Sequence, residues 1–139
     1  MTIAVDRAVA NKPDFADRWS VDVYGRCQNT TDEALDPAAN RLARNGFGLQ
    51  DPRTMKVVGD AALTFVENTF SDALNPGLPP RQCRLTFDLG PDFVPANYVS
   101  VGVSQVEFID SSITGTKDMA WSATRVGWRF NVPLTVQAR

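Results

Sequence analysis

Residues 125–136, with the sequence RVGWRFNVPLTV, form the most regular pattern in the chain. Apolar side chains alternate there with polar or small ones, which is the period of a β-strand. Because proline has no N–H to donate, Pro133 indicates a sheet edge or a bulge at that point. We expect a core-forming strand with Trp128 packed inside. Its predicted apolar face consists of Val126, Trp128, Phe130, Val132, Leu134 and Val136.

Shorter alternating segments predict further strands. Residues 19–24 and 83–89 each alternate between apolar and polar side chains, as half-buried strands do. In residues 99–110 the apolar positions change parity near Ser104 and Gln105, which predicts a β-bulge there.

Two short apolar segments, residues 55–58 and 61–66, are separated by Gly59 and Asp60. This arrangement is typical of a β-hairpin.

One helix is predicted between these strands. Residues 30–33 have the T-x-x-E spacing of a capping box, and Asp36-Pro37 is a second start signal. Good helix formers fill residues 38–45, and Gly46 is a suitable C-cap. The predicted fold class is therefore α+β and β-rich: a mostly antiparallel sheet or small sandwich with one principal helix packed on it.

The length of 139 residues predicts a single domain, 1–139. Residues 1–17 are predicted to be an N-terminal arm or an edge strand, and residues 75–80 (NPGLPP) a proline-rich surface loop. Asp6 and Arg7 lie where a secretory signal would be apolar, and no apolar run approaches the roughly 18 residues that span a membrane. We expect no membrane partner.

The chain contains no histidine, which removes the commonest general base and the commonest metal ligand. Scattered carboxylates could act as an acid–base pair, but Asp22 and Asp88 fall on the polar sides of their strands. We therefore predict no catalytic residue, no metal and no cofactor, and a protein that is not an enzyme. The net charge of −2 argues against generic binding of a phosphate backbone, and we expect no specific nucleic-acid binding.

The two cysteines, Cys27 and Cys83, do not form a C-x-x-C pair. We interpret them as free thiols in a reducing compartment, with a single disulfide as the open alternative.

The order of three short blocks resembles the neck and tail-terminator proteins of tailed bacteriophages, small subunits that cap the tail tube below the head connector. The blocks are VDVYG at residues 21–25, a loop with Asp51-Pro52-Arg53 after the predicted helix, and Val94-Pro95 between the strands at 85–89 and 99–110.

The resemblance implies a structural virion protein, assembled in the host cytoplasm, with an α/β subunit. It implies self-association into a ring, a hexamer, that contacts the tail tube and the head–tail connector, with a lumen through which DNA could pass. It marks Asp51, Pro52 and Arg53 as a subunit-contact loop, although a plain surface turn explains the same residues. The alternatives are a capsid decoration or coat protein, or another tail structural protein. From another class come a monomeric ligand-binding β-domain, with a concave site lined by Trp and Tyr, and a carboxylate-based hydrolase.

Overall fold

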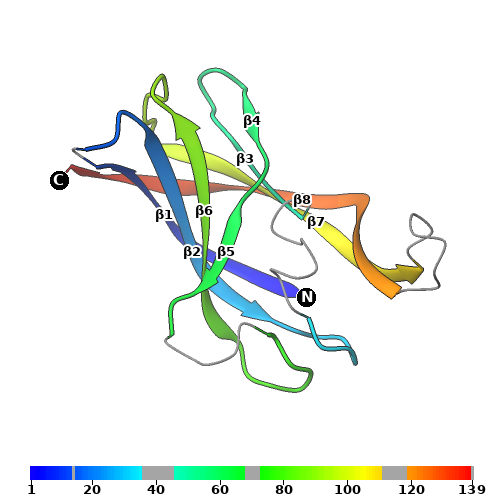
Figure 1. Cartoon of the computed structure of the whole chain (residues 1–139). Coiled ribbons are helices and arrows are strands. Elements are labelled where there is room, and N and C mark those ends of the chain that lie inside the picture. The colour runs from blue at the N-terminus through cyan, green and yellow to red at the C-terminus, as the bar shows by residue number, and fades with distance from the viewer. Residues whose placement is uncertain (14, 36–45, 68–72, 111–118, 139) are drawn as a thin grey trace.

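The computed structural model describes residues 1–13, 15–35, 46–67, 73–110 and 119–138, and strands dominate them (Figure 1). Their bounds are β1 (Thr2–Lys12), β2 (Trp19–Gln28), β3 (Phe47–Gln50), β4 (Val57–Val58), β5 (Ala62–Phe65), β6 (Arg81–Gly90), β7 (Tyr98–Asp110) and β8 (Met119–Ala138).

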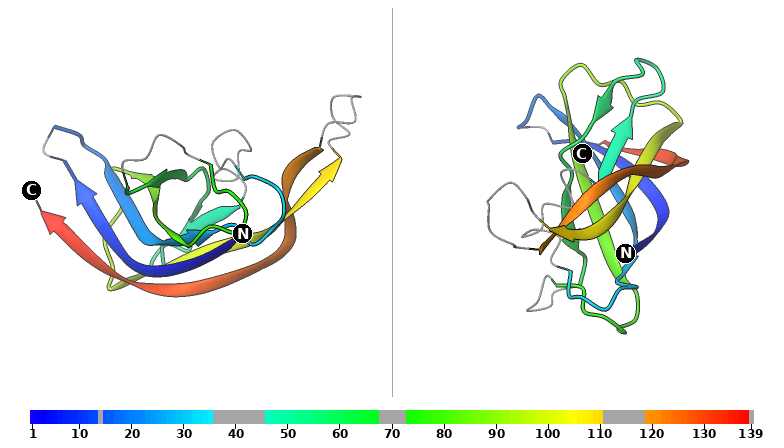
Figure 2. Two further views of the ribbon diagram at one scale, coloured as in Figure 1. Left: turned by 90° about the horizontal axis from the view of Figure 1, so that it is seen from below. Right: turned by 90° about the vertical axis from the view of Figure 1, so that its right-hand side faces the viewer.

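All eight strands belong to one mixed sheet of order β4-β3-β7-β8-β1-β2-β6-β5. Every neighbouring pair is antiparallel except β1 and β8, which are parallel. That parallel ladder joins two halves of four strands each. The sheet curls strongly, as Figure 2 shows, and the edge strand β4 also contacts β6.

The hairpin predicted from residues 55–58 and 61–66 is wrong. β4 pairs with β3, whereas β5 pairs with β6 at the other edge of the sheet. The curl explains this result, because it brings the two edges close enough for residues 59–61 to connect them. Asp60 has a positive φ of 50° in this connection.

The predicted α+β class is also wrong: the described part of the chain is all-β, without a helix. Its curled sheet encloses the core between its own two halves, so a helix is not needed to cover the apolar face. Leu35 instead forms an isolated bridge with Leu74, and Thr31 donates from both its N–H and its hydroxyl to the Asn29 side chain. The rest of the predicted helix, residues 36–45, lies outside the described residues.

The main core lies inside the curl and confirms the alternation read in residues 19–24 and 83–89. Val21 and Val23 of β2 are buried against Leu85 and Phe87 of β6. The same cluster takes Ala8 and Ala10 from β1, Phe47 and Leu49 from β3, Val99 and Val101 from β7, and Val132 and Leu134 from β8.

The predicted β-bulge is confirmed: the β7–β8 register shifts between Ser104 and Val106. Gly127 lies opposite Ser104, and a Cβ at this position would come within 2.8 Å of the Val103 carbonyl oxygen. A second shift, between Val5 and Arg7 of β1, lies beside Gly25 of β2.

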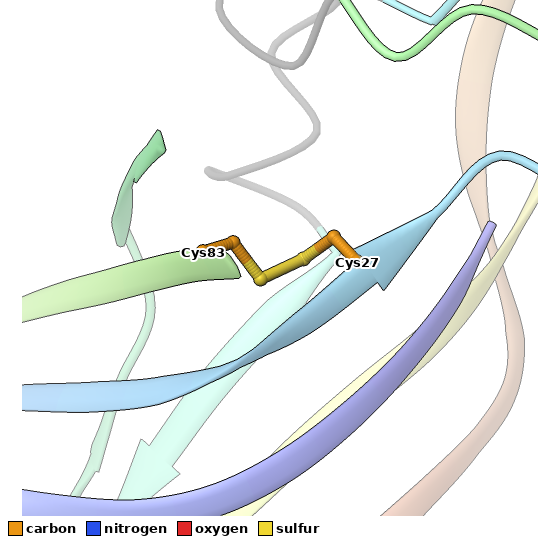
Figure 3. Close-up of a disulfide and its surroundings, with 2 residues drawn as sticks. All are labelled: Cys27 and Cys83. Atoms are coloured by element: carbon orange, nitrogen blue, oxygen red, sulfur yellow. A yellow bond between two sulfur atoms is a disulfide. The ribbon is translucent and has the colours of Figure 1, made fainter. Parts of the chain in front are cut away.

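A disulfide joins Cys27 of β2 to Cys83 of β6, so the interpretation of two free thiols is wrong (Figure 3). The strand register explains the pairing: Cys83 lies opposite Gly25, which makes Cys27 its diagonal neighbour, with the two Cα atoms 6.0 Å apart. Both residues are buried in a second small cluster with Leu35 and Leu74.

Asn29 connects this second cluster to the neighbouring loop. Its side chain is buried and donates to the carbonyl oxygens of Leu74, at 2.8 Å, and Glu33. Its Oδ1 accepts from Thr31. A buried amide with all these partners fixes the chain after β2, since leaving any of them unpaired would be costly.

Candidate subunit interface

Strands β1 and β8 are paired over only part of their length. Their parallel ladder runs from Ala8↔Leu134 to Lys12↔Ala138. Within the described residues, residues 2–7 of β1 form no pairs with residues 119–133 of β8. The two strands therefore diverge, and we call the opening between residues 1–7 and 125–133 the β1/β8 fork.

Pro133 lies where the fork closes. The N–H of the next residue, Leu134, donates to the Asn97 carbonyl oxygen beside β7 at 3.0 Å. Because successive residues of a strand direct their backbone groups to opposite sides, the nitrogen of Pro133 faces β1. It has no hydrogen to donate there, so the parallel ladder begins only after it. The sheet edge predicted at Pro133 is thus present on this side.

The outer edges of the sheet differ from the fork. The edge strands β4 and β5 span only 57–58 and 62–65, and such short strands offer little to an additional strand. Longer strand edges face each other inside the fork, where residues 2–7 pair only with β2 and residues 127–133 only with β7.

The first part of β8 exposes its apolar face. Val126, Trp128 and Phe130 are 57%, 56% and 37% exposed, and Val136 is 52% exposed near the end of the strand. We call these four residues the β8 apolar stripe. The expectation that Trp128 packs in the core is wrong: Trp128 is 56% exposed, and this part of β8 pairs only with β7. Trp121, nearer the start of β8, lies outside the residues whose side chains are described.

Two apolar hollows occupy the fork. One, of about 380 Å³, lies between the start of β1, with Met1 and Ile3, and the facing parts of β7 and β8, with Val103, Val106, Trp128 and Phe130. The other, of about 340 Å³, lies between residues 3–6 and 130–133. Burial lowers the pKa of the Met1 amino group below its ordinary value, because desolvation disfavours the ammonium form.

The loop with Asp51, Pro52 and Arg53 is the turn between β3 and β4. The buried Asp51 carboxylate accepts from the Arg53 N–H at 2.9 Å and from the Thr54 hydroxyl at 2.8 Å. The backbone N–H of Met55 donates to the Asp51 carbonyl oxygen and closes the turn. Asp51 therefore shapes this turn, and Arg53 is exposed on it.

The candidate carboxylates of the strands lie on the outer face of the sheet. Asp88 pairs with Arg18 at 2.9 Å, and Asp22 accepts from Asn11 and Thr86. Among the described residues, no three His, Cys, Asp or Glu side chains are grouped as a metal site would require. Nor does the described part of the chain contain a helix that is long and apolar enough to cross a membrane.

The sequence predicted the β8 strand and an edge at Pro133, but it did not predict the fork. The divergence of β8 from β1 could not be predicted locally, because β1 is distant in sequence.

Comparison with known proteins finds no matching family model, no matching curated protein and no matching solved structure.

Proposed function

We propose that this protein is a structural subunit whose copies associate through the β8 apolar stripe and the β1/β8 fork. The observation that carries the proposal is the exposure of Trp128, Phe130 and Val126 on a strand whose next residues of the same face, Val132 and Leu134, are buried in the core. One apolar face of β8 is thus exposed to solvent at residues 126–130 and buried in the core at residues 132–134.

The energetics favour covering this surface. Burying one large apolar side chain contributes about 1.5–3 kcal/mol. Clustered aromatic side chains are typical of the centre of protein interfaces. The unpaired edges of the fork add a directional component, because a strand from another subunit can pair with them.

A second copy of this chain is the occupant that we propose. The net charge of −2 gives weak repulsion between copies. The same chain also carries both complementary parts, an apolar projection at Val126 and Trp128 and an apolar hollow in the fork. If these two different surfaces meet, the contact is heterologous, and such contacts close into rings or continue into filaments.

Within this class, we propose a ring subunit of a bacteriophage tail, at the neck or tail terminus, on the order of the sequence blocks alone. A capsid decoration or coat protein is the second candidate, and the exposed stripe suits it equally. The exposed stripe and the fork support the broader proposal, an assembly subunit, and do not favour one particle part over the other.

The oligomeric state in solution tests the proposal. Light scattering across a concentration series is expected to show oligomers of the wild-type protein that dissociate in Trp128→Ser. Loss of an interface aromatic costs about 2 kcal/mol, which weakens the dissociation constant roughly 30-fold. Leu78→Ser is the matched control, since Leu78 is 50% exposed in the proline-rich loop, away from β8.

A wild-type protein that stays monomeric at millimolar concentration would overturn the proposal, as would equal oligomerisation of the wild-type and Trp128→Ser proteins. Electron microscopy of the oligomer then separates the finer candidates. Closed rings favour the tail-ring assignment, whereas shells or flat arrays favour a coat or decoration protein.

A further inference from the structure

A polar hollow of about 480 Å³ lies on the outer face of the sheet, on the opposite side from the core. It is bounded by side chains from β1, β2, β6 and the end of β8, with Phe15 at its rim. Its volume suits a small organic ligand, for which pockets of roughly 300–1,000 Å³ are usual. The residues used below are Asn11, Ser20, Asp22, Tyr24, Arg84 and Gln137.

Tyr24 lies between two arginines in this surface. The register places Arg7 of β1 and Arg84 of β6 directly opposite Tyr24 on its two sides. The Arg7 guanidinium lies 4.5 Å from the centre of the Tyr24 ring, a cation–π distance. Arg7 thereby fixes the ring, and Tyr24 still lines the hollow.

Arg84 supplies positive charge to the hollow. Its Nε donates to the Thr64 hydroxyl at 3.3 Å, which orients the guanidinium without neutralising it. The ion pairs formed among the described residues are Lys12–Asp17, Arg18–Asp88 and Arg26–Asp6, and none involves Arg84 or Arg7. A guanidinium of this kind is suited to bind a carboxylate through two hydrogen bonds.

Asp22, the carboxylate in the hollow, already has partners. Its Oδ1 accepts from the Thr86 hydroxyl at 2.6 Å, and its Oδ2 accepts from the Asn11 amide at 3.1 Å. These bonds cross from β1 through β2 to β6 and hold the floor of the hollow in place. Ser20 and Gln137 add a neutral hydroxyl and an amide, so the site can both donate to and accept from hydroxyl groups.

We propose that this hollow binds an acidic saccharide, a sugar that carries a carboxylate. The carboxylate binds Arg84, an apolar face of the sugar ring packs on Tyr24, and the sugar hydroxyls bind Asn11, Ser20 and Gln137. Phe15, which is 95% exposed at the rim, offers a second apolar surface for a longer chain. A free inorganic anion would fill little of this volume, and the mixed charges of the face disfavour a polynucleotide.

The test is a titration followed by NMR with trigalacturonate and, as the matched ligand, its methyl ester, in which each carboxylate is replaced by a neutral ester that carries an added methyl group. We expect millimolar or tighter binding of trigalacturonate, with shifts concentrated on Ser20, Asp22, Tyr24 and Arg84, and at least tenfold weaker binding of the ester. Arg84→Gln should abolish this difference between the two ligands. Arg53→Gln, which removes an exposed arginine on the β3–β4 turn, should preserve it.

Sialyllactose and lactose form a second charged and neutral pair, which tests whether a different acidic sugar is preferred. The proposal is overturned if neither acidic probe binds at 10 mM, if the neutral partners bind equally, or if Arg84→Gln leaves the affinity unchanged. It is also overturned if inorganic phosphate competes at equal concentration, because the site would then recognise charge alone. None of the residues that line this hollow lines the two hollows of the fork, so a failure to bind saccharide would not overturn the proposed subunit association.

Discussion

Replacing both cysteines with alanine, Cys27→Ala/Cys83→Ala, should reduce the free energy of unfolding by about 4 kcal/mol. The bridge closes a loop between residues 56 positions apart. The chain-entropy relation, which grows with the logarithm of loop length, gives about 4 kcal/mol at 25 °C for a loop of this size. A small domain has only about 5–15 kcal/mol of stability, so this loss is a large share. Alanine is preferred to serine because both sites are buried, and a serine hydroxyl would lack a partner.

Guanidinium chloride unfolding followed by tryptophan fluorescence measures the change. Reductant should lower the stability of the wild-type protein toward that of the double variant and leave the variant unaffected. Alkylation of the denatured, unreduced wild-type protein should add no mass. Two added alkyl groups would show that the thiols are free and refute the bridge. A confirmed bridge with a loss below about 1 kcal/mol would refute the loop-entropy argument instead.

Three further substitutions, with Arg53→Ala as a control, test the local geometry by chemical denaturation. Gly25→Ala should destabilise by about 1–3 kcal/mol, because its Cβ would collide with the Ala4 carbonyl oxygen; an unchanged midpoint would contradict this contact. Asn29→Ala should cost about 1–3 kcal/mol by leaving buried backbone groups unpaired, and a neutral effect would show that water replaces the amide. Asp51→Ala should lower the free energy of unfolding by about 1–2 kcal/mol, because two hydrogen bonds to its carboxylate are lost. Arg53→Ala should change it by less than about 0.5 kcal/mol. Equal losses in the two variants would contradict the conclusion that the Asp51 hydrogen bonds stabilise this turn.

Local patterns in the sequence predicted the strands well. The alternation in residues 19–24 and 83–89 corresponds to buried positions of β2 and β6, and the parity change near Ser104 corresponds to the observed bulge. These features depend on side chains only a few residues apart. The period of two therefore reports them directly.

Features that depend on distant partners could not be predicted in this way. The disulfide requires the register of β2 against β6, and the short segments at residues 55–58 and 61–66 were misassigned because their true partners are β3 and β6. The β8 pattern indicated an apolar face but not how much of it the domain itself covers. Trp128 is exposed where β8 pairs with β7 alone and has diverged from β1, which no local period reveals.

The candidate site was found only in part. Pro133 marked the end of the unpaired edge, but the other side of the fork is formed by residues 2–7, which had been interpreted as part of an arm or edge strand. The loop at Asp51, selected by resemblance, is explained as a hydrogen-bonded turn. The outer-face hollow was not predicted at all, because its residues come from four strands that are scattered along the chain.

The parallel ladder between β1 and β8 determines when this protein can finish folding. It is the ladder that joins the two four-strand halves of the sheet, and it pairs residues 8–12 with residues 134–138, which are far apart in the sequence. On the ribosome, β1 is synthesised long before β8, and the halves can join only when β8 is available. Contacts between such distant segments slow folding to milliseconds or seconds. Until residues 134–138 are available, the β1 edge that later pairs with β8 stays open and can pair with another chain, which favours aggregation.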